Sequence, residues 1–208
     1  MALSEHSSSE DSLSKQKAEI RRDILIKRNE LPALRRIEMS LSAGDIGSKA
    51  IRFEENTIIS GFFPIRSEID ARPLMDALAQ RGARLCLPAV IDKTTIEFRE
   101  LKRGCAMVDT GFGTRGPGPD AEILDPDIMI APLAAYDMKG GRVGYGAGYY
   151  DRAIDKLMRK NAPPFLIGLA FAMQEMVHVP VEAHDIPLNA ILTEIDYKLI
   201  STGKLNEK

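Results

Sequence analysis

The sequence predicts a layered α/β domain with a mostly parallel central sheet. Segments rich in β-branched and aromatic residues alternate with segments of helical periodicity, which is typical of folds that place helices between parallel strands. A chain of 208 residues is long enough for one domain with a full hydrophobic core. We expect that domain to cover residues 13–203, after a polar, disordered tail over residues 1–12.

Charge and cysteine content exclude several classes of protein. The formal net charge of -2 argues against non-specific binding to nucleic acid, which needs a strong basic excess. The two cysteines, Cys86 and Cys105, provide neither a disulfide framework nor zinc-site spacing, so a reduced, cytoplasmic setting is expected. No segment is apolar over the length of a membrane span, and the N-terminus lacks the apolar core of a signal peptide.

The first expected helix covers residues 13–29. Ile20, Ile24 and then Lys27 or Arg28 recur in it at helical spacing. Lys17 and Arg21 share a face one turn apart. Charge runs of this kind are usually solvated helix faces, so the pattern alone does not assign the pair to a site.

Two further helices are expected before the middle of the chain. One begins at Pro32, a favourable residue in a first helical turn, and carries Leu34, Ile37 and Leu41. Gly44 and Gly47 are candidate interruptions of this helix, because glycine weakens a helix interior. The other helix covers residues 72–81 and stops before a glycine.

Strands are expected where short apolar runs are bounded by turn residues. The expected strands are 57–63, 84–90, 94–101, 128–135, 165–170 and 195–200. The third, 94–101, is expected near an edge of the sheet. Residues 104–126 hold many Gly, Pro and Asp and are expected to form a long loop. A loop of that length in a compact domain is usually functional or disordered.

A glycine-rich stretch over residues 140–152 (GGRVGYGAGYYDR) follows the strand expected at 128–135 and precedes a helix expected at 153–160. A strand, a glycine turn and a helix start together favour phosphate binding, because backbone amides and the positive end of the helix dipole converge there. The stretch lacks the Gly-Lys-Ser/Thr ending of a Walker loop, and Tyr149 takes the third glycine's place in a dinucleotide motif. Arg142 and Arg152 flank the turn and favour phosphate over a purely structural turn.

Three acidic or titratable positions have two interpretations each. Asp151 is either a helix-start residue or a magnesium ligand beside a polyphosphate. Glu68 follows the end of a strand, where open α/β sheets bind ligands, or it is an exposed turn carboxylate. His184, next to Asp185, is either an acid–base residue or an exposed loop histidine. No catalytic triad can be assembled from the sequence.

The segments 132–137 (PLAAYD) and 141–152 (GRVGYGAGYYDR) resemble the signature of the 5-formyltetrahydrofolate cyclo-ligase family, also called 5,10-methenyltetrahydrofolate synthetase. The resemblance covers roughly residues 15–200 and includes Lys17-x-x-x-Arg21, the segment 68–70 (EID) and the segment 184–188 (HDIPL). It implies a three-layer α/β/α sandwich, Rossmann-like, with a mostly parallel sheet. It also implies an enzyme that uses ATP and Mg²⁺ to convert 5-formyltetrahydrofolate to 5,10-methenyltetrahydrofolate, ADP and phosphate.

The resemblance also implies a two-substrate site and assigns residues to it. ATP would contact the cations of the first helix and the glycine stretch: Lys17, Arg21, Arg142, Val143, Gly144, Tyr145, Gly146, Ala147, Gly148, Tyr149 and Tyr150. Folate would contact Phe63, Glu68 and Tyr145, while Asp151 and Asp185 would hold Mg²⁺. Arg142 and Tyr150 are the expected catalytic residues. The chain departs from the family pattern at Ala147, at Asn189, which replaces an aspartate and is not counted as a ligand, and at Gly116-Pro117.

The chemistry that the resemblance implies needs no protein nucleophile. A formamide carbon is a poor electrophile, and transfer of the γ-phosphate to the formyl oxygen turns that oxygen into a leaving group. The nitrogen at folate position 10 then closes the ring, so the protein mainly aligns substrates and neutralises phosphate charge. The partners would be small molecules only, and a monomer is expected. The alternative is a non-catalytic regulator that binds a nucleotide or a sugar phosphate on the same scaffold.

Overall fold

The computed structural model describes residues 3–111, 113–160, 162–182 and 185–200. In this part of the chain a seven-stranded sheet has the order β11-β10-β9-β6-β1-β2-β3. The inner neighbours β2, β1, β6, β9 and β10 are parallel, and the two edge strands are antiparallel to their neighbours. The bounds are β1 Ile58–Ser60, β2 Arg84–Val90, β3 Ile96–Glu100, β6 Ile128–Pro132, β9 Phe165–Leu169, β10 Ala190–Leu192 and β11 Tyr197–Leu199. The expected mostly parallel sheet, with the third strand at an edge, is confirmed.

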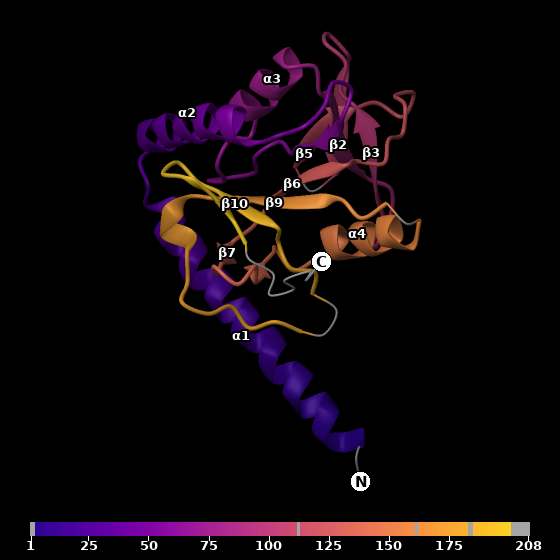
Figure 1. Cartoon of the computed structure of the whole chain (residues 1–208). Coiled ribbons are helices and arrows are strands. Elements are labelled where there is room, and N and C mark those ends of the chain that lie inside the picture. The colour runs from indigo at the N-terminus through magenta and orange to yellow at the C-terminus, as the bar shows by residue number, and fades with distance from the viewer. Residues whose placement is uncertain (1–2, 112, 161, 183–184, 201–208) are drawn as a thin grey trace, which may run out of the picture.

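Helices cover both faces of this sheet, which confirms the expected three layers (Figure 1). Helices α2 (Ala33–Ala50) and α3 (Arg72–Gln80) lie on one face, and α4 (Tyr149–Arg159) lies on the other. Successive residues of a strand point to opposite faces, so Ile130 of β6 packs in the core under α2 and α3 while Met129 packs in the core under α4. The two cores thus share every central strand.

Helix α1 (Leu3–Asn29) packs against a small hairpin, β7 (Ala135–Tyr136) and β8 (Arg142–Val143), and against the short helix η1 (Ala172–Gln174). Its N-terminal turns extend away from the rest of the chain (Figure 1). The helix ends at Asn29 as expected but begins at Leu3, within the segment that was expected to be a disordered tail. The proposed domain limits, 13–203, stay a prediction.

The buried face of α2 differs from the expected one. Leu34, Ile37 and Leu41 are 69%, 57% and 56% exposed, and apart from Met39 the helix buries small residues instead. A Cβ on Gly47 would lie 2.5 Å from Leu192 and 2.7 Å from Leu74, and one on Gly44 would lie 3.1 Å from Pro73. The glycines therefore do not interrupt α2. They allow its backbone to approach α3 and the sheet closely.

Two other segments were predicted too simply. The long loop expected at 104–126 contains a hairpin, β4 (Met107–Gly111) and β5 (Thr114–Pro117). The glycine stretch does not follow β6 directly, because β7 comes between them and the stretch itself contains β8, and α4 starts at Tyr149 rather than at residue 153. Strand β10 was not predicted.

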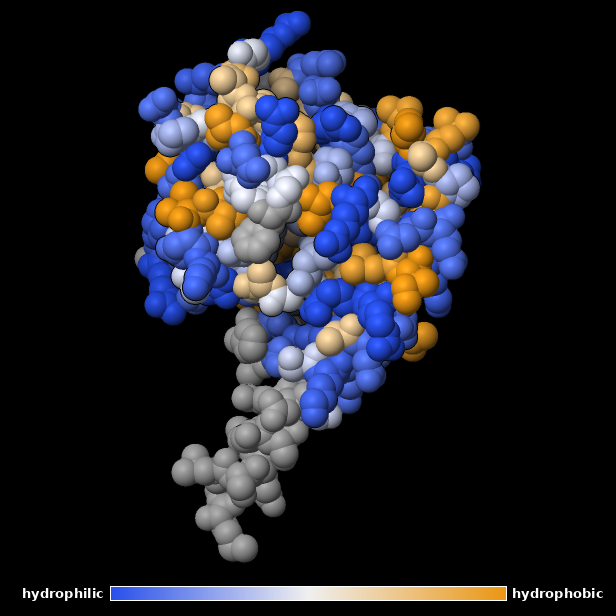
Figure 2. Space-filling model, turned by 180° about the vertical axis from the view of Figure 1, so that it is seen from behind, coloured by the Kyte–Doolittle hydropathy of each residue, from blue (hydrophilic) through white to orange (hydrophobic). Residues whose placement is uncertain are grey.

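The surface shows no dominant apolar region on the face seen in Figure 2, where small apolar patches alternate with polar residues. None of the described helices combines the length and the apolar character that crossing a membrane would require.

Candidate functional site

The glycine stretch is held in place by a buried aspartate, Asp137, in the turn of the β7–β8 hairpin. Its Oδ1 accepts hydrogen bonds from the N–H groups of Lys139 and Gly141, both at 2.9 Å. Its Oδ2 accepts one from the N–H of Val179 at 2.8 Å. Asp137 thus fixes the hairpin and ties it to the segment that leads to Glu182 and Asp185.

Left-handed glycines shape the loop between β8 and α4. Gly146 has φ 94° and Gly148 has φ 65°, a region that other residues adopt only with strain. Gly148 is the residue before the first turn of α4, so the chain turns there and directs the N-terminus of the helix at the loop. This is the strand, turn and helix arrangement that favours anions.

Arg21 reaches this loop from α1. Its Nε donates a hydrogen bond to the carbonyl of Gly144 at 2.7 Å. A Cβ on Gly146 would lie 3.3 Å from the Arg21 Cζ, so the guanidinium rests directly against the loop. Burial lowers the pKa of Arg21 from its ordinary value. Arg21 is therefore part of the loop's surroundings and does not lie on a solvated helix face.

Lys17, one turn earlier on α1, lies between two carboxylates. Its Nζ is 2.6 Å from Glu182 Oε2 and 2.5 Å from Asp185 Oδ2. Burial alone would lower the pKa of Lys17, but the hydrogen bonds to Asp185 and Glu182 outweigh it and the pKa is raised. Lys17 is thus held as a cation. Glu182 has no role in the sequence-based prediction, because a single acid in a polar loop carries no pattern.

Arg142 joins the loop to the same C-terminal segment. Its guanidinium donates one hydrogen bond to Asp151 Oδ1 and another to the carbonyl of Ile186. Asp151 therefore lies beside the segment that carries Asp185. It also stands in the first turn of α4, where a negative charge is favoured by the helix dipole, although it makes no side-chain cap. Both interpretations of Asp151 thus have a structural counterpart.

The carboxylates in this region fit Mg²⁺ by their chemistry. Mg²⁺ prefers oxygen ligands and is commonly held by one or two carboxylates, with water completing its shell. Asp151, which pairs with Arg142, and Asp185, next to the Ile186 whose carbonyl Arg142 also contacts, carry such oxygens. Among the described residues, no group of three or more His, Cys, Asp and Glu side chains is arranged so that it could hold a metal ion. A two-carboxylate arrangement is therefore what this part of the chain offers.

Glu68 and Tyr145 form the second half of the site. Glu68 is 7% exposed, in the loop between β1 and α3, and is not an exposed turn carboxylate. Its Oε2 accepts a hydrogen bond from the N–H of Ile65 at 2.8 Å, and the carboxylate is also hydrogen-bonded to Tyr145. Burial raises the pKa of Glu68, while Tyr145, Ile65 and Arg28 act in the opposite direction.

Arg28 contacts the candidate site at Tyr145, and the sequence interpretation did not assign it there. It is 1% exposed, and its Nη1 donates a hydrogen bond to the hydroxyl of Tyr145 at 2.6 Å. A signal was present in the sequence. Ile20, Ile24 and Arg28 follow one another at four-residue intervals, so a charged residue continues the apolar face of α1.

The remaining expected site residues lie at the border of this region. The hydroxyl of Tyr150 is buried and has no hydrogen-bond partner among the described residues, and burial raises its pKa. Phe63 lies in the same β1–α3 loop as Glu68, with its ring centroid 5.6 Å from the Arg72 guanidinium. Tyr149 donates a hydrogen bond to the carbonyl of Asp92, in the turn between β2 and β3, at 3.2 Å.

Three other sequence positions have different outcomes. Arg152 is exposed and donates to the carbonyls of Thr94 and Ala147, so it braces the loop from outside. Asn189 accepts a hydrogen bond from the N–H of Leu166 at 2.7 Å and connects β9 to β10, consistent with its exclusion as a ligand. His184 lies outside the described residues.

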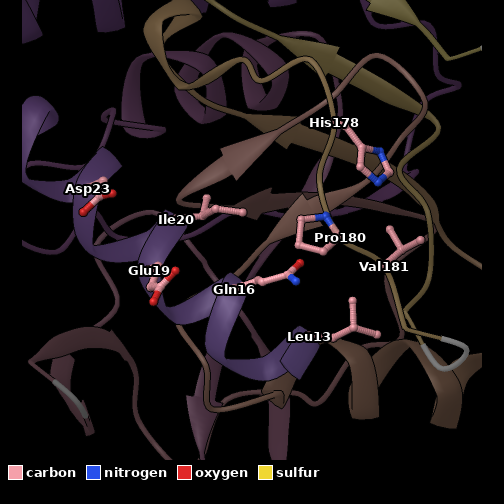
Figure 3. Close-up of a pocket in the computed structure, with 8 residues that line it drawn as sticks. All are labelled: Leu13, Gln16, Glu19, Ile20, Asp23, His178, Pro180 and Val181. Atoms are coloured by element: carbon pink, nitrogen blue, oxygen red, sulfur yellow. The ribbon is translucent and has the colours of Figure 1, made fainter. Parts of the chain in front are cut away.

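A cleft of about 470 Å³ lies beside the site, between α1 and the segment around residue 180 (Figure 3). Its walls carry Glu19 and Asp23 from α1 and His178 from the facing segment. Two carboxylates would repel a polyphosphate, and the cations Lys17 and Arg21 are not among the lining residues. This cleft is therefore not the candidate nucleotide site.

A model of the 5-formyltetrahydrofolate cyclo-ligase family matches residues 13–194. The chain belongs to this family. It is 29% identical over 180 residues to a 5-formyltetrahydrofolate cyclo-ligase of Haemophilus influenzae, covering 84% of this chain and 95% of that protein. The expectation of a ligase is confirmed by this membership.

Solved structures of cyclo-ligase relatives have the same fold. A 5,10-methenyltetrahydrofolate synthetase of Aquifex aeolicus superposes with a TM-score of 0.76 at 27% identity, over 92% of this chain and 96% of that one. One from Mycoplasma pneumoniae superposes with a TM-score of 0.67 at 21% identity, over 86% and 98%, and supports the fold alone.

Proposed function

We propose that the chain uses ATP and Mg²⁺ to convert 5-formyltetrahydrofolate to 5,10-methenyltetrahydrofolate, with release of ADP and phosphate. The observations that carry the proposal are two cation–carboxylate pairs beside a glycine loop. Arg142 at the start of the loop pairs with Asp151. Lys17 pairs with Asp185 and lies one helical turn from Arg21, which itself contacts the loop at Gly144. Family membership supplies the reaction class, and the arrangement of charges supplies a place for a metal-bound polyphosphate.

The nucleotide end is formed by the loop from Arg142 to Tyr150 together with α1. Loop amides and the N-terminus of α4 would bind the phosphates, while Lys17, Arg21 and Arg142 would neutralise their charge. Asp151 and Asp185 would hold Mg²⁺, which supplies further positive charge to the transferring phosphoryl group. When Mg-ATP binds, Lys17 and Arg142 would exchange their carboxylate partners, Asp185 and Asp151, for phosphate oxygens.

The folate end is formed by Phe63, Glu68 and Tyr145. Tyr145 belongs to both ends, because it lies in the phosphate loop and is hydrogen-bonded to Glu68. In the proposed reaction the formyl oxygen attacks the γ-phosphorus and ADP leaves. The nitrogen at position 10 then attacks the formyl carbon, loses its proton and expels phosphate. Arg142 would stabilise the charge on the transferred group. The Tyr150 hydroxyl, which lacks a partner among the described residues, would donate a hydrogen bond there.

An absorbance assay for methenyltetrahydrofolate tests the proposal directly. Purified protein with 5-formyltetrahydrofolate, ATP and Mg²⁺ should form product, and omission of any one component should abolish product formation. Mg-ATP binding without product from 5-formyltetrahydrofolate would instead support the non-catalytic regulator.

We also propose that the enzyme acts as a cytoplasmic monomer on small molecules, without nucleic-acid or membrane partners. The formal net charge of -2 supports the absence of nucleic-acid partners. Light scattering coupled to size exclusion would give the mass in solution, and a dimer mass would contradict the monomer.

A further inference from the structure

Arg28 is a buried cation that forms no ion pair with a carboxylate within 4.0 Å among the residues that the structure describes. It is 1% exposed. Removing a guanidinium from water is unfavourable unless its hydrogen bonds are satisfied, and a direct carboxylate partner is the usual solution. Here two neutral hydroxyl groups take that place. Arg28 Nε donates to Ser67 Oγ at 3.1 Å, and Nη1 donates to the Tyr145 hydroxyl at 2.6 Å.

The hydrogen-bond chemistry of these groups determines their direction. A guanidinium has five N–H donors and no acceptor, so each hydroxyl must accept from Arg28 through a lone pair. The single O–H of Tyr145 is then left to donate to its other partner, Glu68. The same logic holds at Ser67, whose Oγ donates to Asn29 Oδ1 at 2.5 Å. Arg28 is thus the first donor in two series of hydrogen bonds, and in each series the hydroxyl that accepts from Arg28 donates to the next side chain.

We propose that Arg28 is a positioning residue that fixes the Tyr145 hydroxyl as a donor to Glu68, and so keeps the Glu68 side chain as an acceptor for N–H groups of the folate ring. This inference rests on the proposed function, because it assigns Glu68 to the folate end of the site. Glu68 as a neutral acid would be able to donate to Tyr145 instead. The Tyr145 hydroxyl accepts a hydrogen bond from Arg28 and keeps its own O–H as a donor. Donation from that O–H favours the ionised form of Glu68 over the neutral acid.

The charges around Glu68 support this role. The groups that face it are Arg28 from α1, Tyr145 from the loop, Tyr150 from α4 and the N–H of Ile65. Burial raises the pKa of Glu68, and the field of Arg28 is the only contribution in this set from a full positive charge. Without Arg28 the carboxylate would be protonated more readily, and the folate end would lose its acceptor.

The test compares Arg28→Met with Arg28→Lys and with a control, Arg22→Met. Arg22 lies on the same helix but is exposed and paired with Asp23, so its charge is screened by water. Carbon-13 NMR of the labelled Glu68 carboxyl group in ligand-free protein gives its pKa. Equilibrium binding of 5-formyltetrahydrofolate without ATP, measured from pH 5 to pH 8, gives the affinity.

Arg28→Met should raise the pKa of Glu68 and shift the pH dependence of folate binding upward. Its folate affinity near neutral pH should fall roughly tenfold or more, since a charged hydrogen-bond network is lost. ATP-analogue affinity should stay within about twofold, because Lys17, Arg21 and Arg142 are intact. Arg28→Lys, which keeps the charge and a donor, should restore part of the folate affinity, and Arg22→Met should match the wild type.

An unchanged pKa of Glu68 in folded Arg28→Met would overturn the proposal. So would equal losses of folate and nucleotide affinity together with a lower thermal midpoint, which would make Arg28 a purely structural residue. Failure of the wild type to bind 5-formyltetrahydrofolate is a different result. It would overturn the proposed function, while the NMR titration would still decide whether Arg28 controls Glu68.

Discussion

Arg142 and Asp151 form an ion pair across the start of α4. Lys17 and Asp185 form a second pair, at 2.5 Å, which Glu182 joins at 2.6 Å. In each pair the cation is the proposed phosphate ligand and the carboxylate is the proposed metal ligand. Each of these proposed phosphate ligands is therefore paired with a carboxylate of the same chain, and it follows that nucleotide and metal ion should depend on each other for binding.

Removal of metal should weaken nucleotide binding strongly. ATP alone would have to separate Lys17 and Arg142 from their carboxylates and leave those carboxylates facing the phosphates. We expect EDTA to lower the affinity for a non-hydrolysable ATP analogue at least about tenfold, or about 1.4 kcal/mol. Calorimetric titrations with and without Mg²⁺ measure this, and equal affinities would contradict the exchange of partners.

Arg142→Ala should raise the ATP requirement. The substitution removes a charge-assisted phosphate contact, and we expect kcat/KM for ATP to fall roughly 100-fold. Arg159→Ala is the matched control, because Arg159 is an exposed arginine of α4 that pairs with Asp155. Initial rates at varied ATP give both values, and unchanged ATP kinetics in Arg142→Ala would count against the phosphate loop.

Asp151→Asn should raise the Mg²⁺ concentration needed for half-maximal activity by roughly tenfold, since one metal carboxylate is lost. The fold should survive, because asparagine keeps a side-chain oxygen that can accept the hydrogen bond from Arg142, and the Asp151 side chain is itself 32% exposed. Asp155→Asn, one turn further along α4, serves as the control. If Asp151→Asn unfolds the protein, the residue is a structural helix-start residue.

Glu68→Gln should stabilise the protein at neutral pH while it weakens folate binding. The pKa of Glu68 is raised in the folded state, so the folded state binds this proton more tightly than the unfolded state. The stabilisation that this proton provides is complete at low pH and is lost as pH rises through the folded pKa. The thermal midpoint of Glu68→Gln should therefore exceed that of the wild type at pH 8, by a margin that shrinks at pH 5. A lower midpoint at both values would contradict this account.

Gly146→Ala should harm both stability and nucleotide binding. An alanine at φ 94° is strained by about 1–2 kcal/mol, and its Cβ would lie 3.3 Å from the Arg21 Cζ. Gly104→Ala is the control for strain alone, since Gly104 has φ 79° and nothing within 4 Å of the added carbon. Denaturant unfolding should show similar losses in both variants, whereas only Gly146→Ala should raise KM for ATP.

Local patterns were sufficient for most of the fold. The mostly parallel sheet, the C-terminal end of α1 and, to within one residue, both ends of α3 follow from periodicity and turn residues. The buried face of α2 could not be predicted in this way. Gly44 and Gly47 lie on it because neighbouring residues leave no room for a side chain, and glycine adds no signal to a hydrophobic pattern.

The candidate site divides in the same way. A long signature identifies the glycine loop, but Glu182 becomes a partner of Lys17 only through a contact between distant parts of the chain. Arg28 was hidden for a related reason. Its position on an apolar helix face makes sense only once Tyr145 and Ser67 are placed against it.

The contacts of Lys17 with Glu182 and Asp185 span 165 and 168 residues of sequence. During synthesis Lys17 leaves the ribosome long before these two partners exist, whereas β1, β2 and β6 are already available to pair. A chain arrested before Glu182 is translated would contain most strands of the sheet and the whole glycine loop. Lys17 would then lack both of its carboxylate partners. The proposed metal ligand Asp185 therefore joins Lys17 only after most of the sheet has been translated.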